Sequence, residues 1–272
     1  MSPMDLPRGV LGVVHLPALP GDPAHVNGSF RDVERFAMAD AEALAKGGVR
    51  GIVLENFGSA PFPKGTAGAR VPAHHAATLA ILARACVERF GLAVGVNCLR
   101  NDVLSALGVA ASAGASFVRV NVHTGAYITD QGLIEGEADV SLRYRASLAP
   151  ARPAIAADVL VKHASPLAPL TMTQAVHEAL DRGLADAVIV TGQATGSEVN
   201  EDELAEAREA ADDRPVWLGS GLTPEHAEVF ARYADAAIVG TWLKRGGQVH
   251  APVDEARVAE IVAAFGEGRP RE

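Results

Sequence analysis

Polar side chains stand at the ends of short apolar segments in this chain, and two of them could carry a reaction. Glu55 closes Gly51-Ile-Val-Leu-Glu55, and a carboxylate there can act as a general base or bind a divalent cation. Lys162 closes Asp158-Val-Leu-Val-Lys162, and a partly buried lysine can polarise an oxyanion, hold a phosphate or form a Schiff base. Ion pairs of Glu55 with Lys162 or Arg119, or of Lys162 with Asp158, are the structural alternative.

Two histidines and two asparagines occupy similar positions. His15 and His123 end other strand-like segments, where an imidazole could ligate a metal or shuttle a proton. Asn97 and Asn121 could orient a sugar hydroxyl or a carbonyl through their neutral amides. Hydrogen bonding within the protein is the structural alternative for all four. The candidate catalytic set is therefore Glu55, Lys162, His123, Asn121, His15, Asn97, Asp158 and Arg119.

The alternation of side chains along two segments supports this choice. Between residues 117 and 123 the valines alternate with three polar residues, Arg119, Asn121 and His123. In a strand the alternate residues share one face, so this polar set would point into the mouth of a barrel. The same alternation places Asp158 and Lys162 on one face of their segment. Burying such groups is costly unless they are paired or serve a ligand.

Glycine-rich turns near the C-terminus predict an anion site. Two apolar segments end in such turns, over 215–221 and 235–241. Glycine lets the backbone approach a ligand, and helix N-termini carry partial positive charge, so successive turns of this kind can cradle a phosphate. The candidate phosphate ligands are Gly219, Ser220, Gly221, Gly240 and Thr241, with Thr191 and Gly192 from a third turn over 190–196.

The elements that must position these residues alternate regularly. Strands are predicted over 10–16, 49–55, 92–98, 116–122, 155–162, 186–191, 215–219 and 235–240. Helices are predicted over 30–47, 73–90, 101–113, 138–148, 171–183, 200–212, 223–232 and 254–265. Eight βα units without a linker favour an α/β fold, a single (β/α)8 TIM barrel spanning residues 1–272. An open doubly wound sheet is the alternative. Long connections after strands, such as 56–71 and 123–137, would lie at the carboxyl end of the barrel, where active sites form. The connection over 123–137 could be a lid over the substrate or an ordered surface hairpin.

Composition restricts the partners. The 272 residues are 49% hydrophobic and carry 24 basic and 33 acidic side chains, for a net charge of −9. An acidic chain argues against a nucleic-acid footprint, which needs a basic face. There is no signal-peptide pattern, and the apolar runs are shorter than the roughly 20 residues that span a bilayer. We therefore expect a cytoplasmic protein without integral membrane association. Homo-oligomers are common among such barrels, but no segment indicates an interface.

Six motifs are distinctive as a set. They are Gly12-Val-Val-His15-Leu-Pro-Ala-Leu-Pro-Gly21, Val53-Leu-Glu55-Asn56-Phe57, Gly95-Val-Asn97 with Asn101-Asp102, Val120-Asn121-Val-His123-Thr-Gly125, Val161-Lys162-His163 and Gly219-Ser220-Gly221. The set resembles the BtpA/SgcQ family from about residue 10 to residue 265. The resemblance implies a TIM barrel related to the ribulose-phosphate-binding barrels. The family takes its name from a protein linked to photosystem I biogenesis, and other members lie in sugar-utilisation gene sets. An aspartate often follows the Asn-Phe-Gly segment in this family; Ser59 stands there in this chain, so chemistry that depends on that aspartate would be altered.

Two classes of function follow. The first is an enzyme of the lyase, aldolase or isomerase type acting on a small phosphorylated sugar or related metabolite. The second is an assembly or biogenesis factor that retains a barrel and performs no chemistry. The chain has no GxxxxGK[ST], no GxGxxG after its first strand, no HExxH and no CxxC, so no nucleotide or redox cofactor and no structural zinc are expected. A divalent metal at Glu55 is a variant of the enzyme hypothesis.

Overall fold

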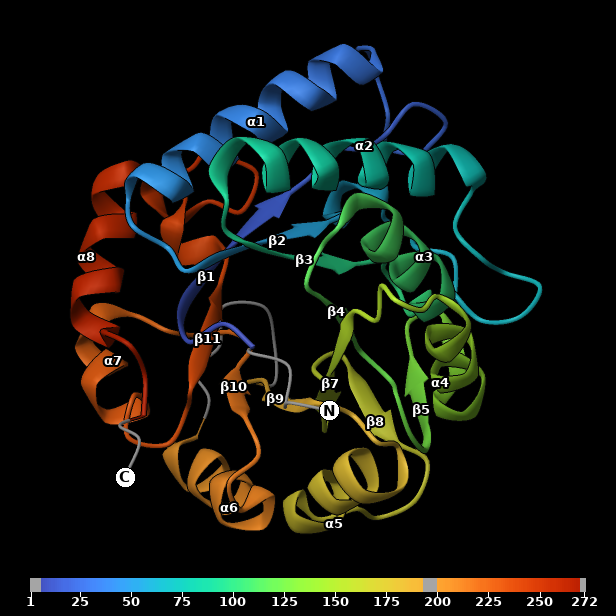
Figure 1. Cartoon of the computed structure of the whole chain (residues 1–272), viewed down its shortest axis with the longest axis vertical. Coiled ribbons are helices and arrows are strands. Elements are labelled where there is room, and N and C mark those ends of the chain that lie inside the picture. Colours follow the sequence, from blue (N-terminus) through green and yellow to red (C-terminus); the bar gives the residue numbers. More distant parts are fainter. Residues whose placement is uncertain (1–5, 193–199, 270–272) are drawn as a thin grey trace.

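Eight parallel strands close into a barrel in the computed structural model, which describes residues 6–192 and 200–269. Around the ring the order is β1-β11-β10-β9-β7-β4-β3-β2 (Figure 1). The strands are β1 (Gly9–His15), β2 (Gly51–Glu55), β3 (Ala93–Asn97), β4 (Phe117–Val120), β7 (Ala154–Val159), β9 (Ala187–Val190), β10 (Val216–Leu218) and β11 (Ala236–Val239). The closed ring confirms the (β/α)8 barrel and excludes the open sheet.

The helices surround the ring, as Figure 1 shows. They are α1 (Phe30–Lys46), α2 (Ala73–Phe90), α3 (Val103–Ala113), α4 (Ala138–Ser147), α5 (Met172–His177), α6 (Glu201–Ala211), α7 (Pro224–Phe230) and α8 (Glu255–Phe265). Several of them begin with residues that favour a helix N-terminus. Asp102 and Thr171 accept backbone N–H bonds at the starts of α3 and α5, and Pro224 opens α7.

The interior of the barrel is apolar at one end and polar at the other. Leu11, Val53, Phe117 and Trp217 are completely buried in the apolar part, where the rings of Phe117 and Trp217 lie 5.0 Å apart. Towards the carboxyl ends of the strands the inward positions become polar, and the register places His15 beside Glu55 and Glu55 beside Asn97. The apolar part supplies core packing, so the polar part must be stabilised by its own hydrogen bonds or by a ligand.

A second, three-stranded sheet lies beside the mouth of the barrel. It consists of β5 (Ala126–Thr129), β6 (Gly132–Glu135) and β8 (Ala164–Pro166), in the antiparallel order β6-β5-β8. Its buried residues Tyr127 and Ile134 pack against Val122 and Val161. The long connection over 123–137 is thus an ordered hairpin, and the segment that follows Lys162 completes its sheet.

Two barrel strands end earlier than predicted, because the chain leaves the ring to build this second sheet. The strand predicted over 116–122 ends at Val120, and the one predicted over 155–162 ends at Val159. Beyond Val159 the backbone turns sharply, with Leu160 in the left-handed region at φ 46°. The alternation of side chains therefore cannot be extended to His123 or Lys162, whose positions depend on the loops.

Candidate active site at the mouth of the barrel

A cavity of about 820 Å³ opens at the carboxyl ends of the barrel strands. Pockets of this size suit a small metabolite. The predicted residues in its wall are His15, Glu55, Arg119, Asn121, Lys162, Gly219, Ser220, Gly221, Gly240 and Thr241. The structure thus gathers most of the predicted set around one space, from segments that extend from His15 to Thr241 in the chain.

Glu55 is held in place by the neighbouring strand. The side-chain amide of Asn97 donates to Glu55 Oε2 at 2.7 Å, and both side chains are buried. Asn97 does not line the cavity, so it acts through Glu55 by fixing the direction of its carboxylate. On the other side, Nε2 of His15 lies 3.7 Å from Glu55 Oε1. A carboxylate oriented in this way, at the edge of a cavity, can serve as a general base.

His15 is a neutral imidazole at neutral pH. Burial is the main cause that lowers its pKa well below 6.5, and the nearby positive charges, Lys244 first and then Lys162, lower the pKa further. Its Nδ1 is buried without a hydrogen-bond partner in the described part of the chain. A neutral ring with one unpaired nitrogen in the cavity wall can donate to or accept from a ligand, so His15 is suited to hydrogen bonding rather than to charge pairing with Glu55.

Asp158 orients two residues of the cavity wall. Its carboxylate accepts from Arg119 at 3.0 and 3.1 Å and from the Asn121 side-chain amide at 2.6 Å. All three groups are buried. Because the Asn121 nitrogen is committed to Asp158, its Oδ1 is left as a buried acceptor without a partner among the described residues. A ligand that presents a hydroxyl to Asn121 would satisfy that acceptor.

Lys162 has an unusually acidic ammonium group. Burial is the largest cause that lowers its pKa, to about 8; Arg119 and Arg100 also lower it, while Glu55 and Asp158 oppose the shift. Its backbone N–H donates to Thr191 Oγ1 at 3.2 Å, which fixes the loop beyond β7. A lysine with a pKa near 8 exchanges its proton close to neutral pH, as acid–base and carbonyl chemistry require.

The glycine turns have a packing reason as well as a proposed ligand role. A Cβ on Gly240 would lie 2.6 Å from Cε1 of His15, and a Cβ on Gly219 would lie 2.5 Å from Ile189. Ser220 Oγ accepts from the backbone N–H of Gly192 at 3.2 Å, which joins the turn after β10 to the end of β9. The absence of a side chain at 219 and 240 thus lets the inward residues of the barrel reach the cavity wall.

We expect Gly240→Ala to disturb the site more than the fold. The backbone at residue 240 has a negative φ of −120°, so glycine is not needed there for a left-handed conformation, but the added methyl group would overlap the His15 ring. Overpacking of this kind costs about 1–3 kcal/mol. Urea unfolding should show that loss, and the NMR resonances of His15 should shift. Unchanged His15 resonances would contradict the packing role.

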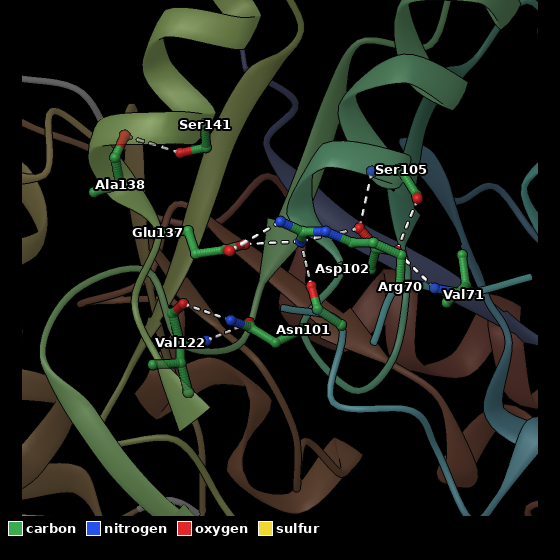
Figure 2. Close-up of polar contacts among 10 residues, drawn as sticks. Arg70, Val71, Asn101, Asp102, Ser105, Val122, Glu137, Ala138 and Ser141 are labelled. Carbon is green, nitrogen blue, oxygen red and sulfur yellow. Dashed lines mark hydrogen bonds and ion pairs between the residues drawn. The ribbon is translucent and has the colours of Figure 1, made fainter. Parts of the chain in front are cut away.

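A polar cluster ties together the loops around the mouth (Figure 2). Arg70, from the β2–α2 connection, makes a two-bonded ion pair with Glu137 at 2.8 and 2.9 Å. Asp102 Oδ2 accepts from the backbone N–H of Val71 at 2.8 Å, and the Asn101 side chain bonds the backbone of Val122 in both directions at 2.8 Å. Asp102 also caps α3, so the contacts of Asn101 and Asp102 join the loops after β2, β3 and β4 to the start of that helix.

Comparison with known sequences gives the family. The sequence description of the BtpA family matches residues 7–267. The chain belongs to the BtpA family. Among its BtpA-family relatives, the photosystem I biogenesis protein BtpA of Synechocystis sp. is 44% identical over 259 residues, which cover 95% of this chain and 88% of that protein. An uncharacterized protein of Methanocaldococcus jannaschii is 38% identical over 262 residues, covering 96% and 97% of the two chains.

Solved structures share the barrel of this BtpA-family chain at low identity. Thiamine phosphate pyrophosphorylase from Pyrococcus furiosus superimposes with a TM-score of 0.57 and 13% identity, over 95% of this chain and 96% of that one. Orotidine 5'-phosphate decarboxylase from Pyrococcus horikoshii superimposes with a TM-score of 0.57 and 15% identity, over 94% and 98% of the two chains. At these identities the likeness concerns the fold.

Some predicted residues of this BtpA-family protein lie outside the cavity wall. His123 is buried, and its Nε2 contacts the backbone oxygen of Gly183 at 2.7 Å instead. Asn97 and Asp158 act from behind the wall, through the side chains described above. Thr191 and Gly192 support the wall through Lys162 and Ser220, and residues 193–196 of their turn lie outside the described residues.

Several wall residues were not predicted. Among them are Arg100, Asp130, His163, Trp242 and His250, all from loops. Because these residues lie in connections, the alternation of side chains along a strand cannot predict which way they point. Arg100 does lie within the motif segment 95–102. Ser59 is buried and donates to Asp22 Oδ2 at 2.7 Å. The Ser59 hydroxyl therefore joins the loop after β2 to the loop after β1.

The described residues contain no group of three or more His, Cys, Asp or Glu side chains placed to hold a metal. Glu55, with Asn97 and His15 beside it, offers two or three donors at most. None of the described helices is both long and apolar enough to cross a membrane.

Proposed function

We propose that this protein is an enzyme acting on a small phosphorylated sugar or related metabolite, with carbonyl chemistry of the lyase, aldolase or isomerase type. The observation that carries the proposal is Lys162, whose pKa is lowered to about 8 in a cavity that also contains the fixed carboxylate of Glu55. Perturbed lysines beside carboxylates in a cleft are typical of catalytic sites.

The substrate phosphate is placed at the turns after β10 and β11. Ser220 and Thr241 supply hydroxyl groups there, and the glycines expose the backbone. The solved structures with the same fold include proteins named for thiamine phosphate, orotidine 5'-phosphate and phosphoribosyl anthranilate, all phosphorylated compounds. In a barrel of this kind the last two strands commonly provide the phosphate site.

The reacting carbonyl then faces Lys162 and Glu55. The Lys162 ammonium would stabilise the negative charge that develops on the carbonyl oxygen. Glu55 would remove a proton from the carbon next to the carbonyl, the electron pair moving to the oxygen to give an enolate. For a substrate with a hydroxyl group on that carbon, return of the proton to the former carbonyl carbon, with the hydroxyl proton passing to the original carbonyl oxygen, completes an isomerisation. In the lyase variant Glu55 would instead remove the proton of the hydroxyl group on the β carbon; the bond between the α and β carbons would break, the β carbon would leave as a second carbonyl compound, and the electron pair would pass to the first carbonyl oxygen as an enolate. His15 and Asn121 would orient the substrate hydroxyls.

A second candidate is a non-catalytic assembly factor. It is favoured by one observation, the 44% identity with the photosystem I biogenesis protein of Synechocystis sp.. A protein that performs no chemistry gains nothing from a buried lysine with a lowered pKa, and loss of catalysis would relax the need for this group. The test below separates the two candidates.

A thermal-shift screen with phosphorylated sugars and their unphosphorylated counterparts tests the enzyme proposal. A ligand at 100 times its Kd stabilises the folded state by about 2.7 kcal/mol. We expect a rise in Tm that requires the phosphate and that disappears in Ser220→Ala/Thr241→Val. Parallel samples with Mg²⁺, Mn²⁺ or Zn²⁺ test the divalent-metal variant.

The matched control is Ser147→Ala/Thr173→Val, which removes the same atoms from exposed helix positions. This control should retain the full ligand-induced shift. If no phosphorylated ligand shifts the Tm of the folded wild-type protein, the enzyme proposal fails in favour of the assembly factor or an unphosphorylated substrate.

A further inference from the structure

Arg100 is a buried cation whose charge has no close carboxylate. The residue is 6% exposed, lines the cavity, and donates from Nη2 to the backbone oxygen of Lys162 at 2.9 Å. Within residues 6–192 and 200–269, no carboxylate oxygen lies within 4.0 Å of its guanidinium. Arg119, the other buried arginine in the wall, donates from Nε and Nη2 to the Asp158 carboxylate. A guanidinium removed from water without such a partner is costly unless another anion compensates it.

The position of Arg100 in the ring gives the geometry. It follows β3 by three residues, while the predicted phosphate turn of Ser220 follows β10. In the ring order, β3 and β10 are separated by three strands in either direction, so their loops face each other across the mouth (Figure 1). Both loops line the same cavity of about 820 Å³. One ligand that fills it would therefore meet the Ser220 turn at one end and Arg100 at the other.

The negative side chains in the wall and directly behind it are hydrogen-bonded to other residues or distant from Arg100. Glu55 accepts a hydrogen bond from Asn97, and Asp158 accepts hydrogen bonds from Arg119 and Asn121. Asp130, in the turn between β5 and β6, also faces the cavity, and its charge reaches Arg100 only at longer range. A planar guanidinium with several N–H groups is the protein's best match for a carboxylate or phosphate, so Arg100 is suited to an anionic group of the ligand.

We propose that Arg100 binds a second anionic group of the substrate, so that the substrate carries negative charge at both ends, as in a sugar bisphosphate or a phosphorylated sugar acid. This inference rests on the proposed function, in which the first phosphate binds at the turns after β10 and β11. It narrows the substrate class from phosphorylated sugars in general to those with an anion about one sugar chain away from the phosphate.

Titration calorimetry with three five-carbon probes tests the proposal. The probes are ribulose 5-phosphate, ribulose 1,5-bisphosphate and 5-phosphoribonate, which end at carbon 1 in a hydroxymethyl group, a phosphorylated hydroxymethyl group and a carboxylate; the ribonate also has a hydroxyl group in place of the ketone at carbon 2. Wild type should bind one of the doubly anionic probes at least tenfold more tightly than the monophosphate, and the preferred probe identifies the anion as phosphate or carboxylate. Arg100→Gln should reduce that preference to less than threefold. Arg100→Lys, which retains the charge but not the two-bonded geometry, should give an intermediate preference.

The control is Arg84→Gln, which removes the same charge from an exposed position on α2 and should keep the wild-type preference. A wild type that binds the three probes equally, or an Arg100→Gln variant with the full preference, overturns the second-anion site. In that case Ser220→Ala/Thr241→Val still reports on the proposed function, because it should weaken all three probes. If wild type binds none of them, the proposed function and this inference both fail.

Discussion

Replacing Lys162 by methionine is expected to remove the proposed activity and, at pH 7, to make the protein more stable. The stability gain should be about 1–3 kcal/mol in the free energy of unfolding, because folding lowers the pKa of this lysine from its ordinary 10.5 to about 8. Each pKa unit corresponds to about 1.4 kcal/mol, and the upper figure is reduced because the side chain is only partly buried. A stabilising substitution in a cavity wall is the mark of a residue retained for function.

The pH dependence gives this prediction its sign. Between about pH 8 and pH 10.5 the unfolded chain keeps the Lys162 proton while the folded chain has lost it, so this group makes wild type more stable as the pH rises. Methionine has no proton to lose. The advantage of Lys162→Met over wild type should therefore be full near pH 7 and nearly gone near pH 10, when both are unfolded with urea.

Lys46→Met is the matched control for the stability measurement. Lys46 lies exposed on α1 beside Glu42, so its removal should give no pH-dependent advantage over wild type. An equal difference between Lys162→Met and wild type at pH 7 and pH 10 would contradict the lowered pKa.

The catalytic half of the prediction needs the substrate found by the ligand screen. We expect turnover to fall by about 10²–10³-fold in Lys162→Met, the size of effect seen when a group that stabilises a developing oxyanion is removed. In wild type, kcat/KM should fall as the pH rises through about 8, because the ammonium form is the active one. A rise through the same range would indicate the neutral amine and a Schiff base, and normal turnover in the variant would remove Lys162 from the mechanism.

The sequence predicts the part of the site that the barrel strands position. Phe117, Arg119 and Asn121 share one face of a segment that continues β4, so the alternation rule correctly places Arg119 and Asn121 in the cavity wall. His123 breaks the rule because β4 ends at Val120 and the chain turns into the hairpin. Lys162 also lines the cavity, as the alternation rule predicts. The rule does not explain its position, however, because the backbone leaves the strand conformation at Leu160, two residues earlier.

The residues contributed by loops could not be predicted in this way. Arg100 and His250 lie in connections whose paths depend on contacts far away in the sequence, such as the ion pair of Arg70 with Glu137. Local patterns carry the period of a strand or a helix, but they do not carry these long-range contacts. The missing carboxylate around Arg100 is likewise a property of the folded chain, and it cannot be seen before the loops are placed.

The buried pair of Lys244 and Asp40 is expected to give the largest loss of stability in this protein. Lys244 follows β11 and is fully buried; its Nζ donates to Asp40 Oδ2, on α1, at 2.6 Å. Asp40 Oδ1 accepts from the backbone N–H of Val253 at 2.8 Å. The pair thus fixes to α1 the loop that carries Thr241 and His250 into the cavity wall.

Asp40→Ala should lower the free energy of unfolding by about 3–5 kcal/mol, because it leaves a buried ammonium and a backbone N–H without their partner. Urea unfolding measures the loss. The double variant Asp40→Leu/Lys244→Met should recover most of it, since no charge is then left buried. Glu42→Ala, which breaks an exposed pair on the same helix, should hardly change the stability. A double variant as unstable as Asp40→Ala would show that the contacts of the pair, and not the unpaired charge, carry the effect.

The same double variant connects this pair to the site. Lys244 is the charge that contributes most to lowering the pKa of His15, after burial. Removing that charge should therefore raise the pKa of His15, as followed by NMR titration, while Glu42→Ala leaves it unchanged. If His15 were protonated, its positive charge would lie 3.7 Å from Glu55 Oε1, and the electrostatic attraction between the two side chains would become stronger. The buried pair would thus fix the position of the loop and, after burial itself, contribute to keeping His15 neutral.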